Sequence, residues 1–280
     1  MSIDSDATDT GRTSDADLVD SLQDSVSPGT DSPAAGSDNC EPGRQTTDTQ
    51  LSSPPLASRE LGLSTKCVHS GERRQKPEGS ITAPIFTAST FTFESTASLL
   101  RFVEGHEQRE EYGRYGNPNE RSVEAKLAAL DGAEDAILYS TGMAAIVGLL
   151  MSRLNAGDEI VFFDQCYHRS REFCTKHLSR FGVVTHQVPT GDFEAMEAAI
   201  TSKTKMLVSE SPTNPHLTAV DLERFVAVGQ AHEVETLIDA TLATPFNLKP
   251  IDYGVDYVLH SATKYLGGHN DLLAGVCLLY

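Results

Sequence analysis

The chain has 280 residues and a formal net charge of −18, and hydrophobic residues make up 39% of it. This length is enough for one large domain or two small ones. The strongly acidic balance argues against nucleic acid and anionic membranes as partners, although an anionic cofactor needs only a local positive site. No apolar run reaches the length of a transmembrane helix, and the N-terminus has neither a signal-peptide core nor an arginine-rich transit sequence.

The five cysteines are spread thinly along the chain without C-x-x-C spacing. An odd, scattered set supports neither a disulfide framework nor a zinc site, so no metal is expected. With no targeting segment in view, the composition predicts a cytoplasmic protein.

Residues 1–60 contain twelve Asp and Glu against three Lys and Arg, which accounts for half of the net charge. They are rich in Ser, Thr, Gly and Pro, and such a segment buries too little apolar surface to offset the entropy lost on ordering. We therefore expect a disordered acidic tail. Residues 61–118 are expected to form an extended arm with irregular or strand-like stretches at 82–86 and 89–93, followed by a polar loop.

From residue 119 onward, helical and strand patterns alternate. Helices are expected at 120–130, 143–154, 171–181, 193–200 and 222–232. Strands are expected at 136–139, 159–163, 183–188, 205–209, 236–239, 257–260 and 275–279. Such alternation predicts an α/β domain over residues 119–280, in which a mostly parallel sheet lies between two layers of helices.

The carboxyl ends of parallel strands are where ligands bind in sheets of this kind. The first expected strand is followed by Ser140-Thr141-Gly142-Met143, which opens a helix. Free backbone N–H groups at a helix start bind phosphate, and Gly142 would let the anion approach closely. The alternative is an ordinary helix cap by the serine or the threonine.

Three further strand ends carry residues suited to a flat, charged ring. Tyr167 follows the second strand and is placed to stack on such a ring, unless it simply lies on a loop. Asn214 lies between two prolines, and it either faces the crevice or serves their turn. Asp239 ends an apolar strand, where a carboxylate is costly unless paired. A protonated pyridine nitrogen would pair with it, and capping of the next turn is the alternative.

The sixth strand is followed by Ser261-Ala262-Thr263-Lys264 and a glycine-rich turn. We expect Lys264 to be partly buried, which would lower its pKa and leave a neutral amine able to attack an aldehyde. The expected aldehyde is pyridoxal phosphate (PLP), held as a Schiff base, with Ser261 and Thr263 donating hydrogen bonds to its phosphate. The S-x-T-K pattern is weak alone. Its combination with the other strand ends makes coincidence a poor explanation.

Four ordered motifs resemble one known family. They occupy residues 112–118, 140–145, 209–215 and 260–271. In this order and spacing they are similar to the trans-sulfuration enzymes, the PLP-dependent cystathionine γ-synthase, cystathionine lyase and methionine γ-lyase family of fold type I. The stretch at 164–171 resembles the plant-type cystathionine γ-synthases more than the lyases.

The resemblance implies a role for each candidate residue. Lys264 would bear the cofactor and move protons, Asp239 would pair with the pyridine nitrogen, and Tyr167 would stack on the ring. The other cofactor contacts would come from Gly142, Met143, Ser261 and Thr263 on the phosphate and from Asn214 near the ring oxygen or the substrate carboxylate.

Two further residues would serve the neighbouring subunit's site. Tyr112 and Arg114 would reach the phosphate of that subunit's cofactor, and a Tyr112 with a lowered pKa would act as a base toward the incoming amine. Arg114 suits this place because a guanidinium binds phosphate bidentately. A solvated loop is the alternative for both. The resemblance thus implies a homodimer or homotetramer that acts on small amino-acid substrates.

The implied reaction is γ-replacement, in which an activated homoserine ester condenses with cysteine to give cystathionine. The alternatives are a cystathionine or methionine γ- or β-lyase and an O-acetylhomoserine sulfhydrylase. Members of the family usually continue well beyond the lysine strand into a smaller C-terminal domain, which supplies an arginine for the substrate carboxylate. An alternative of another class is therefore a catalytically silent PLP-binding fragment, in which the strand at 275–279 exposes apolar surface.

Overall fold

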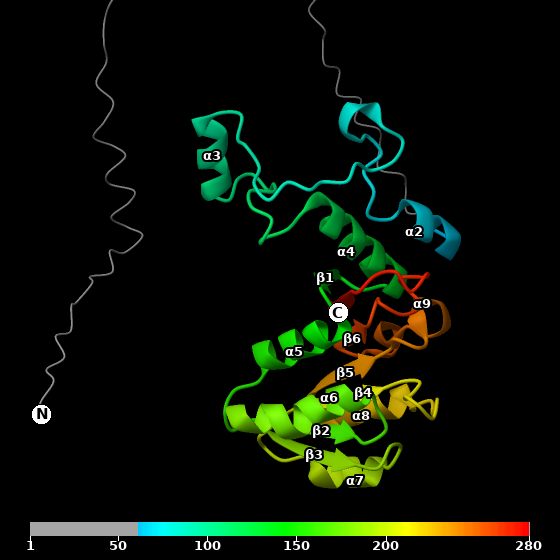
Figure 1. Cartoon of the computed structure of the whole chain (residues 1–280). Coiled ribbons are helices and arrows are strands. Elements are labelled where there is room, and N and C mark those ends of the chain that lie inside the picture. The colour runs from blue at the N-terminus through cyan, green and yellow to red at the C-terminus, as the bar shows by residue number, and fades with distance from the viewer. Residues whose placement is uncertain (1–60, 280) are drawn as a thin grey trace, which may run out of the picture. The chain divides into compact units, whose positions relative to one another are not determined.

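The computed structural model describes residues 61–279, so the predictions for residues 1–60 lie outside it (Figure 1). Its strands are β1 Asp135–Tyr139, β2 Glu159–Phe163, β3 Val184–Val188, β4 Thr204–Glu210, β5 Glu235–Asp239, β6 Tyr257–His260 and β7 Gly275–Leu279. Its α-helices are α2 Leu63–His69, α3 Thr96–Val103, α4 Pro118–Asp131, α5 Gly142–Arg153, α6 His168–Glu172, α7 Phe193–Ala199, α8 Leu222–His232 and α9 Thr244–Asn247. In residues 119–279 these elements confirm the predicted alternation.

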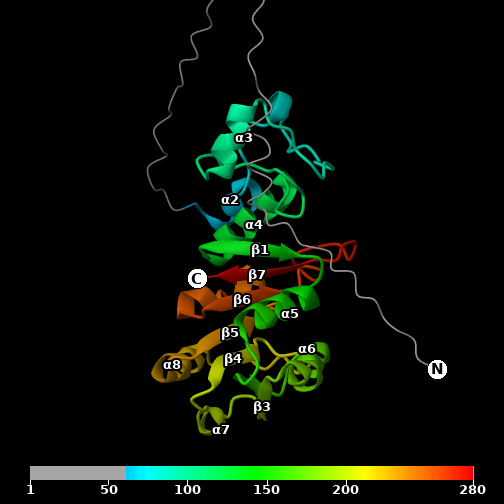
Figure 2. The same cartoon turned by 90° about the vertical axis from the view of Figure 1, so that its left-hand side faces the viewer.

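All the strands of this domain join one sheet in the order β1-β7-β6-β5-β4-β2-β3 (Figure 2). β7 runs antiparallel to both of its neighbours, and the other pairs are parallel. Consequently β1, β2, β4, β5 and β6 all end at the same edge. The mostly parallel sheet predicted from the sequence is confirmed.

Two buried clusters fill the spaces on the two faces of the sheet. Side chains of α4, α7 and α8 pack on one face, and side chains of α5 and of the segment after β2 pack on the other. Neighbouring residues of one strand face opposite clusters, as in β4, where Leu207 belongs to the first cluster and Val208 to the second. This alternation follows from the period of two in a strand, and it gives the three predicted layers.

β7 is an interior strand, and four of its five residues are buried. The expectation that it exposes apolar surface was wrong. Cys277 pairs with Ile137 of β1 on one side and with Leu259 of β6 on the other. β7 is covered on both sides because it lies between β1 and β6 and pairs with both of them.

The predicted helix at 171–181 was also wrong as a single α-helix. α6 begins earlier, at His168, and a π-helical turn Phe173–His177 and a 3-10 turn Leu178–Phe181 follow it. Cys174 and Leu178, which lie in these two turns, are buried. Apolar spacing alone does not distinguish these windings from a regular helix.

The arm at 61–118 is less extended than predicted, since it contains α2 and α3. Within the stretch 89–93, Thr90 forms an isolated bridge with Tyr112, which agrees with the expected irregular or strand-like structure. The side chain of Asn119 accepts a hydrogen bond from the Phe86 N–H (2.8 Å) and donates one to the Pro84 carbonyl (2.9 Å). Asn119 thus fastens the arm to the start of α4.

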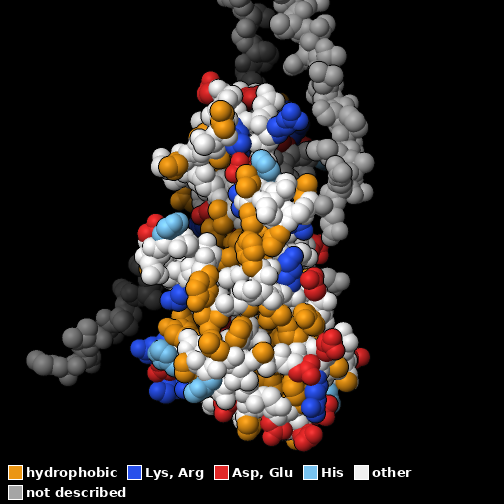
Figure 3. Space-filling model, turned by 90° about the vertical axis from the view of Figure 1, so that its right-hand side faces the viewer, with side chains coloured by type: hydrophobic (Ala, Val, Ile, Leu, Met, Phe, Trp, Pro, Cys, Tyr) orange, Lys and Arg blue, Asp and Glu red, His pale blue; other side chains and the backbone are white. Residues whose placement is uncertain are grey.

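Hydrophobic side chains gather on one face of the molecule (Figure 3). The exposed large ones on loops and short helices beyond the strand ends include Leu217, Phe246, Tyr265, Leu272 and Leu273. Between residues 61 and 279, no helix has the length and apolarity that crossing a membrane requires.

Candidate functional site

The start of α5 and the end of β6 lie in close contact. Thr141 caps α5 by accepting a hydrogen bond from the Ala144 N–H (3.0 Å). A Cβ atom on Gly142 would lie 2.6 Å from the Ser261 Cβ. This approach requires glycine, and it brings the first backbone N–H groups of α5 beside the Ser261 hydroxyl. The cap and the phosphate cradle, given as alternatives above, are therefore compatible.

Asp239 and Ser261 are joined through one threonine. The Thr241 hydroxyl donates a hydrogen bond to Asp239 Oδ1 (2.5 Å) and accepts one from the Ser261 N–H (2.8 Å). The Thr241 N–H also donates to Asp239 Oδ1 (3.0 Å). Asp239 therefore caps the turn after β5, and this turn links it to the loop that carries Lys264.

The pKa of the Asp239 carboxyl is raised by burial, and its bonds from Thr241 lower it less strongly. A carboxylate that burial disfavours gains most from a cationic partner. The ring nitrogen of a protonated pyridine is a partner of that kind, so the site fits the predicted pairing.

Glu210 is a site residue that the sequence reasoning missed. It ends β4 and pairs in register with Asp239 of β5, and its side chain is only 4% exposed. Its Oε2 atom accepts a hydrogen bond from the backbone N–H of Tyr167 (2.6 Å). The signal that singled out Asp239, an acidic residue ending an apolar strand, was equally present here.

Tyr167 lies at the start of α6, at the same edge of the sheet, and its side chain is 38% exposed. Its ring meets the His168 ring edge-on, with centroids 4.9 Å apart. Asn214 is partly buried and precedes a cis peptide bond to Pro215, and another cis bond joins Ser211 and Pro212. Stacking on a cofactor ring requires an aromatic face that is open to solvent, and the partial exposure of the Tyr167 side chain is compatible with that role.

Lys264 is exposed, so its predicted partial burial was wrong for the single chain. The described residues leave this part of the sheet edge uncovered. Lys264 lies in a tight turn in which its N–H donates to the Ser261 carbonyl (3.0 Å). The Thr263 hydroxyl donates to the Ala274 carbonyl (3.1 Å) and accepts from the Ala274 N–H (3.0 Å), so here it bonds to protein.

Tyr112 and Arg114 belong to the arm and form a group of their own. The Arg114 guanidinium lies 5.1 Å from the centroid of the Tyr112 ring and 5.2 Å from that of Tyr115. Among residues 61–279, neither Tyr112 nor Arg114 forms a hydrogen bond or ion pair with the strand-end residues. The single chain therefore does not bring them into the candidate site.

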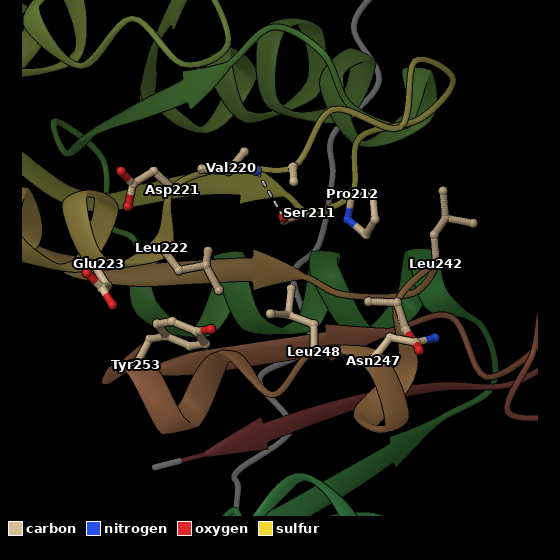
Figure 4. Close-up of a pocket in the computed structure, with 12 residues that line it drawn as sticks. Ser211, Pro212, Val220, Asp221, Leu222, Glu223, Leu242, Asn247, Leu248 and Tyr253 are labelled. Atoms are coloured by element: carbon tan, nitrogen blue, oxygen red, sulfur yellow. Dashed lines mark hydrogen bonds between the residues drawn. The ribbon is translucent and has the colours of Figure 1, made fainter.

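A hollow near these strand ends lies on the α8 side, between the loop after β4 and α9 (Figure 4). Its volume is about 600 Å³, and Ser211, Leu222, Leu242, Leu248 and Tyr253 are among its lining residues. None of the predicted site residues lines it. Glu210 and Asp239 instead line a void of about 10 Å³ together with Cys166 and Ser170.

Replacing Thr241 by valine is expected to destabilise the fold by about 1–3 kcal/mol, because the Ser261 N–H loses its acceptor. Valine has nearly the same shape but removes both side-chain hydrogen bonds. PLP affinity should fall as well, since the Asp239 carboxylate loses a donor. Urea denaturation and a PLP titration measure the two effects. Thr241→Ser keeps the hydroxyl and is the control, and a valine variant as stable as the serine variant would contradict the role.

These residues fit PLP on structural grounds. The helix start with its obligatory glycine suits a phosphate, and the partly buried Asp239 suits a pyridine nitrogen. Lys264 carries an amine at the same edge. In the described part of the chain, no group of three or more His, Cys, Asp and Glu side chains is arranged to hold a metal ion.

The chain is similar in sequence to proteins of known name. The chain is 40% identical over 211 residues to cystathionine γ-synthase 1, chloroplastic, from Arabidopsis thaliana, covering 74% of this chain and 38% of that protein. It is 38% identical over 218 residues to L-methionine γ-lyase from Treponema denticola, covering 77% of this chain and 54% of that protein.

The chain is also similar to a solved structure. The putative O-acetylhomoserine (thiol)-lyase from Campylobacter jejuni, which contains a pyridoxyl-lysine phosphate, superposes with a TM-score of 0.74 at 26% identity. The match covers 78% of this chain and 54% of that one. The chain thus spans between about two fifths and about half of the relatives that it matches.

The profile of one family matches residues 64–279, which is nearly all of the described chain. The fold agrees, because the sheet and its two helical layers are those of the fold type I structures to which the chain is similar. The chain belongs to the Cys/Met metabolism PLP-dependent enzyme family.

Proposed function

We propose that this protein catalyses PLP-dependent γ-replacement, joining an activated homoserine ester to cysteine to form cystathionine. The observation that carries the proposal is the 40% identity to the Arabidopsis cystathionine γ-synthase over 211 residues. The synthase-like stretch at 164–171 supports it. This stretch contains Tyr167, so the similarity extends to a candidate site residue.

We propose that Lys264 binds the cofactor covalently and that its Nζ atom then takes and returns the protons at Cα and Cβ of the substrate. When bound, PLP supplies an electron sink for carbanion chemistry. Asp239 would keep the ring nitrogen protonated, with Thr241 orienting the carboxylate. Tyr167 would cover the ring face, and Asn214 would lie near the ring oxygen or the substrate carboxylate.

The phosphate would be bound at the start of α5. The backbone N–H groups of Gly142 and Met143 and the hydroxyl of Ser261 would donate to it. Thr263 would join them by exchanging the Ala274 carbonyl for a phosphate oxygen. This arrangement neutralises the anion mainly with dipoles, so an additional cation would strengthen it.

We propose that this cation is Arg114 of a second copy of the chain, which makes the functional unit a homodimer or a homotetramer. Arg114 and Tyr112 are exposed in the single chain, and exposed apolar side chains such as Phe246 and Leu273 are available for a protein contact. Light scattering at micromolar concentration should give at least twice the chain mass. A monomer in the presence of saturating PLP would contradict this assembly.

A lyase reaction is the second candidate, because the Treponema methionine γ-lyase is 38% identical to the chain. Product analysis separates the two. A synthase incubated with homoserine ester and cysteine should form cystathionine. A γ-lyase should release 2-oxobutanoate from cystathionine or methionine, a β-lyase should release pyruvate from cystathionine, and a sulfhydrylase should use sulfide in place of cysteine.

The product assay also tests whether the chain is catalytically silent. Turnover by the 280-residue chain would exclude that alternative, and cystathionine as the dominant product would support the proposal. Release of a 2-oxo acid without cystathionine formation would overturn the synthase in favour of a lyase. We also propose a cytoplasmic location, and recovery with an organelle on cell fractionation would contradict it.

A further inference from the structure

Two carboxyl groups lie next to each other at the carboxyl edge of the sheet. Glu210 and Asp239 are register partners on the parallel strands β4 and β5, so their side chains leave the same face of the sheet. Both line the same void, whose volume of about 10 Å³ holds at most one water molecule. Glu210 is only 4% exposed, so water has almost no access to its carboxylate, whereas Asp239 is partly buried.

The Glu210 carboxyl joins two loops that carry candidate site residues. Its Oε2 atom accepts a hydrogen bond from the Tyr167 N–H (2.6 Å), at the start of α6. The backbone N–H of Asn214, in the loop after β4, also acts on this carboxyl. The bond to the Tyr167 N–H therefore connects the start of α6 to the end of β4.

Burial, followed by the charge of Asp239, raises the pKa of Glu210 to about 8, and the two backbone N–H groups only partly oppose this shift. The neighbouring Cys166 adds no charge near neutral pH, because burial raises the pKa of its thiol to about 12. Arg171 acts on Cys166, and His260 acts on Asp239. No other titratable group of the described chain acts on Glu210, so its uncharged form is favoured at neutral pH.

We propose that Glu210 is a positioning residue, whose uncharged carboxyl holds the backbone of Tyr167 at the carboxyl edge of the sheet and leaves the negative charge of the site on Asp239 alone. The inference rests on the proposed PLP site and adds a residue to it. A single charge next to the ring nitrogen would favour a single protonated pyridine. Removing the acceptor would release Tyr167, which is to cover the ring.

The first test uses the PLP-free protein and the substitution Glu210→Gln, which keeps an oxygen acceptor and has no proton to lose. The ordinary pKa of a Glu is about 4.5, so above that pH the unfolded chain has released a proton that the folded chain retains up to about pH 8. Wild-type stability should therefore fall between pH 5 and pH 8. The urea midpoint of the Gln variant minus that of wild type should rise over this range and level off above it.

Glu159→Gln is the matched control. Glu159 lies at the other end of the sheet and accepts a hydrogen bond from His186 (2.8 Å), which holds its pKa below the ordinary value. The same chemical change there should cost stability at neutral pH, and the cost should shrink only as the pH falls below the ordinary Glu pKa of 4.5. Between pH 5 and pH 8 the ionisation of Glu159 should therefore add no pH dependence to the control difference, whereas the difference for Glu210→Gln should rise. Wild type alone must also show the decline, so the test can be read even if the Gln variant does not fold.

The second test is a PLP titration followed by absorbance. Glu210→Ala should weaken PLP binding by roughly tenfold, the equivalent of one backbone hydrogen bond, while Glu210→Gln should stay within about threefold of wild type. A Gln variant as weak as the Ala variant would overturn the inference, as would a urea midpoint difference that does not change with pH. A wild-type chain that takes up no PLP would instead overturn the proposed function.

Discussion

Replacing Lys264 by alanine is expected to abolish covalent attachment of PLP and to lower turnover by about 10²–10⁴-fold through loss of proton transfer alone. Alanine keeps the backbone bond from residue 264 to the Ser261 carbonyl, so the turn at the end of β6 should persist. Borohydride reduction followed by peptide mapping measures the attachment. The reduced adduct should map to Lys264 in wild type and be absent from the variant.

Lys205→Ala is the control for this experiment, because Lys205 is an exposed lysine on β4, in the same sheet. It should leave both the adduct and the absorbance of the bound cofactor unchanged. An adduct that persists on another lysine in the Lys264 variant would contradict the assignment. So would a wild-type adduct that maps outside the peptide containing Lys264.

Replacing Gly275 by alanine is expected to destabilise the protein by about 3 kcal/mol or more. A Cβ atom there would overlap the carbonyl group of Thr141 and approach the Cα of Gly142. These are backbone atoms at the start of α5, so the overlap cannot be relieved by rotating a side chain. β7 and the proposed phosphate cradle would have to separate, and PLP affinity should fall together with stability. Urea denaturation and a PLP titration measure the two losses.

Gly62→Ala provides the comparison, because a Cβ atom at Gly62 would meet no other atom within 4 Å. Its effect should stay within about 0.5 kcal/mol, as for most surface changes. If Gly275→Ala were equally mild, α5 would be free to move away from β7. In that case the close contact among Gly275, Thr141 and Gly142 would not hold the cradle in place.

The sheet and the strand ends were predictable because each depends on a short local pattern. Apolar runs such as 159–163 are strands in the structure, and the amphipathic segment at 222–232 is α8. Chain direction then brings the residues after β1, β2, β4, β5 and β6 to one edge, whatever the details of packing. For this reason the motifs containing Gly142, Asp239 and Ser261 could be brought together from the sequence, and the structure does place them in contact or in one network of hydrogen bonds.

Exposure was predicted less well, because it depends on which segments pack against a residue. Lys264 was expected to be half-buried and is exposed, whereas β7 was expected to be open and lies in the middle of the sheet. β7 is buried because β1, more than 130 positions earlier in the chain, pairs with it. A pattern read within one segment contains no information about such a distant partner.

Glu210 shows most clearly the difference between what the local sequence predicts and what tertiary packing decides. Its place at the end of an apolar strand could be read from the residues, and so could the place of Asp239. Their pairing, the bond from the Tyr167 N–H and the lack of room for water come from three strands that meet at one edge. Local pattern thus determines which groups reach the carboxyl edge of the sheet. Long-range packing determines which of these side chains remain hydrated and which remain ionised. Burial and neighbouring charges act through space and not along the chain.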